Sequence, residues 1–142
     1  MRNSSALRGL FAAEPAAEYD GVVVRPFRYR DEPPLDAHDF VVRGGPLNRE
    51  ATDRNFARCL QIHGIPALSV AAAAGLTPHE IIEASDLLRK YFDEFLWTTV
   101  QNLWDGHYVL TATSHRPHYS LILPGGLTDD TWEDLSQRFQ PL

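Results

Sequence analysis

The sequence predicts an α+β domain, with α/β as the alternative, that has a mixed β-sheet and about three helices. The length of 142 residues suits one domain with a substantial core. A hydrophobic fraction of 44% and a charged fraction of 23% are ordinary for a globular chain. Beyond an N-terminal arm, apolar runs and amphipathic stretches follow in the order β-α-β-α-β-β-β-α, which argues against a doubly wound sheet.

Residues 1–38 are expected to form a flexible N-terminal arm and a Pro-rich link. Residues 1–20 are rich in Ala and Ser without a sustained period, and they favour a frayed tail or one marginal helix. Residues 21–24 suit a short strand, and 31–38 are rich in Pro and Asp, as links are. We therefore expect a single globular domain over 39–142.

The first half of this domain has clear boundaries. The apolar run 40–42 predicts a buried strand, and Asn48 and Gly64 suit the two ends of the helix that follows. Residues 67–71 predict a second strand. A second helix is expected over 77–90, because Thr77, Pro78 and Glu80 form a capping box with proline in the first turn.

The second half is less uniform. Residues 95–100 have the composition of a strand, although a helix over 91–103 is an open alternative. Two further strands are expected over 108–113 and 119–123, joined by a hairpin or a wider loop. The last helix is expected to begin at Thr128, with two aspartates in its first turn.

Charge and cysteine content exclude several classes of protein. The net charge is −6, and the basic cluster of residues 25–30 is followed at once by Asp31 and Glu32, so we expect no direct nucleic-acid partner. Cys59 is the single cysteine, which excludes a disulfide framework and favours a reducing, cytoplasmic location. No apolar run approaches the length of a membrane span, so no membrane partner is expected.

The segment Arg43-Gly44-Gly45 is the best candidate for a ligand site. Glycines at the end of a strand allow a ligand to approach the backbone, and an arginine can donate two hydrogen bonds to a phosphate or carboxylate. The alternative is a tight turn beside a solvated arginine. The segment lacks the full pattern of a P-loop or of a dinucleotide fingerprint.

A strand that ends in Arg43-Gly44-Gly45, followed by a strand that carries Ser69, resembles the first two motifs of the ADP-ribosyltransferase superfamily and of NAD-consuming toxins. The resemblance implies that Arg43 contacts the dinucleotide and that Ser69 supports it. The family's catalytic glutamate on a late strand has no counterpart, because the late strands hold Tyr119 and Ser120 and no carboxylate. More loosely, residues 39–139 resemble small uncharacterised actinobacterial proteins, which implies no activity.

His118 and Tyr119 are the candidates for catalytic residues, because they lie where a loop enters a predicted strand. His115 and His118 have a spacing that can hold an ion, but no carboxylate or cysteine accompanies them at matching positions. No metal is therefore expected, and a surface turn is the plainer interpretation.

Two functions remain after the sequence has been considered. The first is a small intracellular bacterial protein that acts through a protein partner or self-association, with no cofactor, and a two-gene module such as a toxin–antitoxin pair is the setting considered for it. The alternative is an NAD-using or nucleotide-modifying enzyme of the toxin type, with its anion pocket at Arg43-Gly44-Gly45. The sequence leaves open whether the protein is catalytic.

Overall fold

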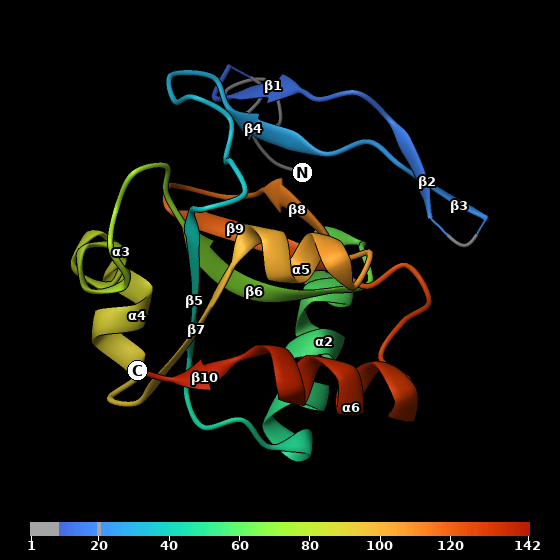
Figure 1. Ribbon diagram of the computed structural model, residues 1–142, viewed down its shortest axis with the longest axis vertical. Coiled ribbons are helices and arrows are strands. Elements are labelled where there is room, and N and C mark those ends of the chain that lie inside the picture. Colours follow the sequence, from blue (N-terminus) through green and yellow to red (C-terminus); the bar gives the residue numbers. More distant parts are fainter. Residues whose placement is uncertain (1–8, 20) are drawn as a thin grey trace.

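A computed structural model describes residues 9–19 and 21–142 (Figure 1). Its elements follow the chain in this order: β1 Phe11–Ala13, β2 Ala17–Tyr19, β3 Val22–Val24, β4 Phe27–Tyr29, β5 Phe40–Gly44, α2 Arg49–His63, β6 Ala67–Ala72, α3 Pro78–Ala84, α4 Asp86–Tyr91, β7 Phe95–Thr99, α5 Val100–Asp105, β8 Val109–Ala112, β9 His118–Ile122, α6 Asp129–Arg138 and β10 Gln140–Pro141. The predicted α+β class is confirmed, and each strand and helix expected beyond residue 39 has a counterpart.

Six strands form the central sheet in the order β10-β7-β5-β6-β9-β8. Every pairing between its described strands is antiparallel, where the sequence predicts a mixed sheet. The sheet bends sharply in the middle: β5 pairs with β7 over five residues, but with β6 only at Val41 and Val42. The strands β5 and β7 therefore run steeply across β6 and β9 (Figure 1).

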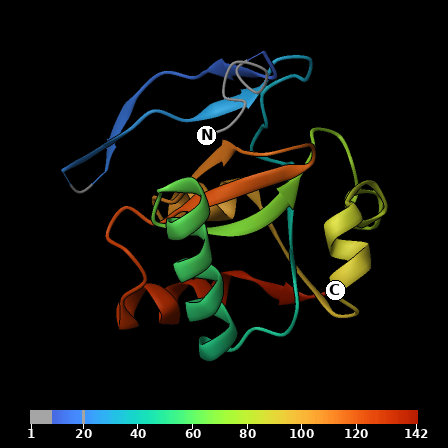
Figure 2. The ribbon, with the colours of Figure 1, turned by 180° about the vertical axis from the view of Figure 1, so that it is seen from behind.

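Both faces of the sheet are covered. On one face, Leu68, Val70 and Leu121 pack with residues of α5, α6 and β4 in the largest buried cluster. On the other face, α2 lies over β6, and α3 and α4 lie over β5, as the reverse view shows (Figure 2). Because side chains alternate along a strand, neighbouring residues of β6 and β9 belong to different faces.

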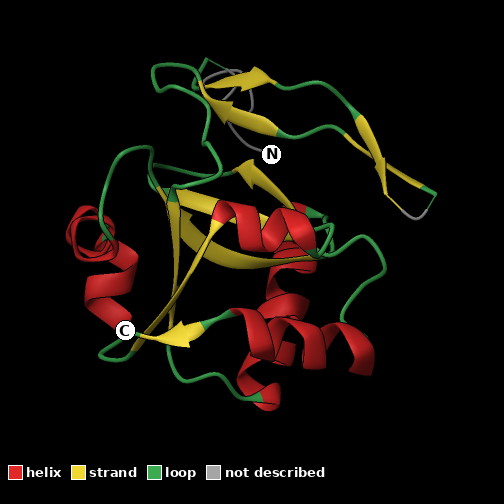
Figure 3. Cartoon of the chain, in the orientation of Figure 1, coloured by secondary structure: helices red, strands yellow, loops and turns green. Residues whose placement is uncertain are grey.

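Two predicted regions turn out to be more finely divided (Figure 3). The helix expected over 77–90 is broken at Ser85, whose extended backbone ends α3 and whose hydroxyl accepts a hydrogen bond from the Leu88 backbone N–H to start α4. Residues 91–103 contain both alternatives, because β7 ends at Thr99 and Thr99 caps α5. The described residues thus form five helices instead of about three.

The N-terminal segment consists of short strands that pair as β1 with β4 and β2 with β3. Residues 1–8 of the predicted arm lie outside the described residues. Tyr29 in β4 is 1% exposed, and its hydroxyl hydrogen is shared between the carbonyl oxygens of Thr113 (2.9 Å) and His118 (2.6 Å). The boundary at residue 38 stays a prediction, but Tyr29 belongs to the main core. By contrast, β2 and β3 project away from the body (Figures 1 and 2).

Candidate functional site

The candidate site lies where β5 and β6 separate. Ser69 lies two residues before Ala71, the first β6 residue that pairs with β5. Its backbone N–H donates to Oδ1 of Asn55 in α2 (2.9 Å), and its carbonyl oxygen accepts from Nη1 of Arg43 (3.0 Å). Two side chains therefore take the place of the strand partner that Ser69 lacks on this side.

Arg43 is the central residue of this site. Its side chain crosses the gap between the strands, and Nη1 also donates to Oδ1 of Asn55 (2.8 Å). Arg43 is only 8% exposed, and burial lowers its pKa to about 10, so the guanidinium still carries its charge at neutral pH. Among the described residues no carboxylate forms an ion pair with it. Buried charges are usually paired, so this one is unusual.

The second edge of the guanidinium remains available. Nε and Nη2 of Arg43 form no hydrogen bond with the described part of the chain, whereas Nη1 forms two. No buried side-chain nitrogen or oxygen in residues 9–19 and 21–142 lacks a partner, so Nε and Nη2 must reach solvent. The edge made by Nε and Nη2 is the one that grips a phosphate or carboxylate side-on.

The remaining members of the cluster come from α2. Asn55 and Cys59 are one helical turn apart and face the sheet. Cys59 Sγ lies 3.3 Å from Ser69 Oγ, and Asn55 Nδ2 lies 3.4 Å from the same oxygen. Cys59 is 2% exposed, which fits an inert buried thiol. Asn55 was not among the predicted site residues, because its role depends on contacts with β5 and β6 that are distant in the sequence.

The structure uses the two glycines for packing. A Cβ at Gly44 would lie 2.4 Å from the ring of Phe92, so the ring rests directly on the glycine backbone. Gly45 has a φ of +88°, and its N–H donates to the carbonyl oxygen of Glu94 (2.7 Å). The Gly45 N–H is thus already bonded within the protein, whereas Nε and Nη2 of Arg43 form no hydrogen bond with the described residues.

His118 and Tyr119 point to opposite faces of the sheet and do not meet at Arg43. His118 is on the α2 face, where Nδ1 lies 2.8 Å from Thr113 Oγ1 and the ring lies 5.8 Å from that of His63. Burial and the neighbouring imidazole lower the pKa of His118, and burial lowers that of His63. Tyr119 belongs to the core on the other face. The two predicted catalytic candidates therefore lie in different environments.

Other kinds of site find no support in the described residues. No group of three or more His, Cys, Asp or Glu side chains in 9–19 and 21–142 is placed to hold a metal ion. In the same part of the chain, every helix is too short or too polar to span a bilayer. No protein-family model matches the chain, and comparison with curated proteins and with solved structures finds no match.

Proposed function

We propose that the protein binds a phosphate-bearing nucleotide, with NAD as the first candidate, through the free side-on edge of Arg43. The observation that carries the proposal is a buried guanidinium that lacks a carboxylate partner among the described residues and whose Nε and Nη2 form no hydrogen bond with them. An anionic ligand would compensate a charge that the fold leaves uncompensated. The resemblance to ADP-ribosyltransferases implies the same role for Arg43. Since β9 contributes no carboxylate, the proposal is one of binding and not of turnover.

NAD, and separately ADP-ribose, are expected to raise the thermal unfolding midpoint. A ligand present at 100 times its Kd adds about 2.7 kcal/mol to the free energy of unfolding. Arg43→Lys keeps a positive charge and loses the fork, so the shift with either ligand should fall by more than half. Differential scanning fluorimetry at fixed ionic strength measures both effects, and acetate in place of the nucleotide tests for a carboxylate ligand.

The matched control is Arg58→Lys, because Arg58 lies on the exposed side of the same helix that supports Arg43. The nucleotide-induced shift of the unfolding midpoint in Arg58→Lys should equal that of the wild type. If neither nucleotide changes the midpoint, or if Arg43→Lys leaves the shift intact, Arg43 is not a nucleotide site.

We also propose self-association as a second function, with another copy of this chain as the partner of the β2–β3 arm. The arm is attached to the body at its base, where Val24 is buried with Cys59 and Ala67. Beyond that point it projects as two strands that, within the described part of the chain, pair only with each other, and Val23 is 70% exposed. A lone two-stranded sheet is marginal in water, and its open edges favour pairing with further strands.

Sedimentation velocity across a hundredfold range of concentration is expected to show a monomer–dimer equilibrium. Val23→Glu places a charge on the arm and should shift this equilibrium to the monomer. Leu60→Glu is the matched control, because Leu60 is also an exposed aliphatic residue but lies on α2. A monomer at every concentration, or an equal response to both substitutions, would rule out association through the arm.

A further inference from the structure

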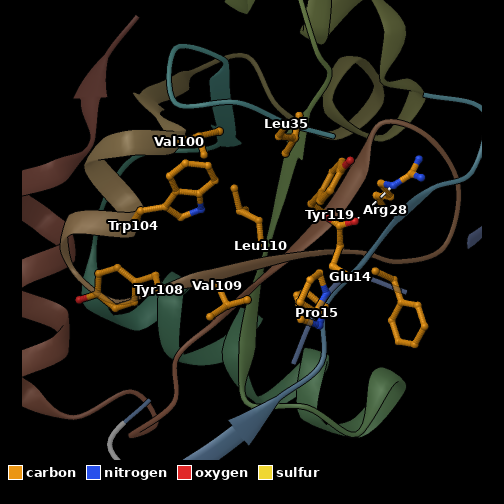
Figure 4. A pocket seen from close by; sticks show the side chains of 12 residues that line it. Glu14, Pro15, Arg28, Leu35, Val100, Trp104, Tyr108, Val109, Leu110 and Tyr119 are labelled. Atoms are coloured by element: carbon orange, nitrogen blue, oxygen red, sulfur yellow. Dashed lines mark ion pairs between the residues drawn. The ribbon is translucent and has the colours of Figure 1, made fainter. Parts of the chain in front are cut away.

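A pocket of about 240 Å³ lies between the N-terminal segment and the body, beside Leu110 and Tyr119 of the largest buried cluster (Figure 4). The N-terminal segment and the body each supply about half of the residues that line the pocket. Its lining includes Glu14, Arg28 and Leu35 from the N-terminal segment, and Trp104, Leu110 and Tyr119 from the body. The pocket has no part in the proposed nucleotide site or in the proposed self-association through the β2–β3 arm.

The hydroxyl of Tyr119 marks the pocket as more than a gap in packing. Tyr119 is 2% exposed, yet its hydroxyl forms no hydrogen bond with the described residues, in contrast to that of Tyr29. No fully buried oxygen in the described ranges lacks a partner, so this hydroxyl keeps some accessible surface, and Tyr119 is one of the residues that line the pocket. Burial raises the pKa of Tyr119, so the group is a protonated donor at neutral pH.

The charges at the polar end of the pocket cancel. Arg28 Nε lies 3.2 Å from Glu14 Oε2, and Arg28 Nη1 donates to the carbonyl oxygen of Glu32 (3.0 Å). Figure 4 shows this ion pair beside the ring of Tyr119. An ion entering here would meet a neutral pair, so the pocket favours an uncharged ligand.

The opposite end of the pocket is apolar and aromatic. Leu35 and Leu110 form aliphatic walls, and Trp104, 43% exposed, stands at the end away from Arg28 (Figure 4). A cavity of about 150 Å³ already holds benzene, so a volume of about 240 Å³ has room for a two-ring compound. Aromatic walls favour a planar ring by stacking or edge contacts.

We propose that this pocket is a second binding site, which takes an uncharged, planar aromatic molecule of about two rings whose single polar group accepts a hydrogen bond from Tyr119. Such a ligand touches both the N-terminal segment and the body, so it joins them. The site is independent of Arg43 and of any nucleotide.

The probes are 2-naphthamide and 2-naphthoate, which have nearly the same shape and differ in charge. We expect 2-naphthamide to bind with a Kd on the order of 0.1 to 1 mM, as befits a ligand of this size. We expect 2-naphthoate to bind at least tenfold more weakly. Chemical-shift titration of the ¹⁵N-labelled full chain measures both, and the shifts should fall on β4, α5 and β8.

Three substitutions test the site. Tyr119→Phe should weaken 2-naphthamide binding five- to tenfold and leave the unfolding midpoint unchanged, because the lost hydroxyl has no partner in the free protein. Leu35→Trp fills the pocket and should abolish binding. Tyr91→Phe, at a tyrosine that is 66% exposed on α4, is the matched control and should change nothing.

Saturable binding of the amide that is lost in Leu35→Trp and retained in Arg43→Lys supports the proposal. Absence of saturable binding overturns it, and equal binding of the carboxylate overturns the charge argument. A midpoint lowered by Tyr119→Phe would show that the hydroxyl is bonded in the free protein. Because Arg43→Lys tests only the nucleotide site, each proposal can fail without the other.

Discussion

Tyr29→Ala is expected to lower the free energy of unfolding by about 3 to 5 kcal/mol, the range for removing a large buried aromatic side chain. The ring is 1% exposed and packs edge-on against Tyr119, with ring centroids 5.5 Å apart. The substitution also removes the hydroxyl that holds the carbonyl oxygens of Thr113 and His118. Urea denaturation followed by circular dichroism measures the change.

Tyr29→Phe keeps the ring and removes only the hydroxyl. It should lower the free energy of unfolding by about 1 to 3 kcal/mol, because two carbonyl groups lose a buried donor. Tyr91→Ala is the control, since Tyr91 is exposed and a surface change is worth about 0.5 kcal/mol or less. If Tyr29→Ala costs no more than Tyr91→Ala, the N-terminal segment is not part of the core, and the domain does begin at Asp39.

Local signals made much of the fold predictable. Asn48, Thr77 and Thr128 each cap the helix that the sequence assigned to them, and Gly64 ends α2 in the left-handed conformation. These features depend on hydrogen bonds between residues close in the sequence. They can therefore be read without knowledge of the tertiary structure.

Of the N-terminal strands, only β3 was predicted, from the valines of residues 22–24, and β1, β2 and β4 were not. Each is three residues long, too short to show a period. The burial of Tyr29 depends on Thr113 and His118, more than eighty residues away. A lone tyrosine between two arginines has no local feature that indicates a core position.

The candidate site was predictable only in part. The sequence placed Arg43 and Ser69 in one site, and the structure brings them within hydrogen-bond distance at 3.0 Å. It gave no sign that β5 and β6 separate there, because the register between strands is a property of the whole sheet. The role of Asn55 follows from that separation, and so does the burial of the guanidinium.

Asn55→Ala is expected to lower the free energy of unfolding by about 2 to 4 kcal/mol. One oxygen, Oδ1, accepts from both Arg43 Nη1 and the Ser69 N–H. Removal leaves a buried amide without a partner and takes one of two acceptors from a buried guanidinium, and losses of this kind exceed the value of an ordinary hydrogen bond. Chemical denaturation measures the loss.

Asn102→Ala is the control, and it should leave nucleotide binding intact. Asn102 also accepts a hydrogen bond from an arginine, but it lies in α5.

Asn55→Asp gives the sharper test, because it separates the structural role of this residue from the uncompensated charge of Arg43. The carboxylate retains an acceptor for both donors, so the free energy of unfolding at pH 7 should stay within about 1 kcal/mol of the wild type or rise. The same carboxylate neutralises the guanidinium, so a ligand phosphate gains little interaction energy from Arg43. The phosphate is also repelled by the negative charge of the new carboxylate. The nucleotide-induced shift of the unfolding midpoint should therefore disappear in a variant that is fully folded. If Asn55→Asp binds NAD as well as the wild type does, the charge of Arg43 is not what holds the ligand, and the nucleotide proposal fails.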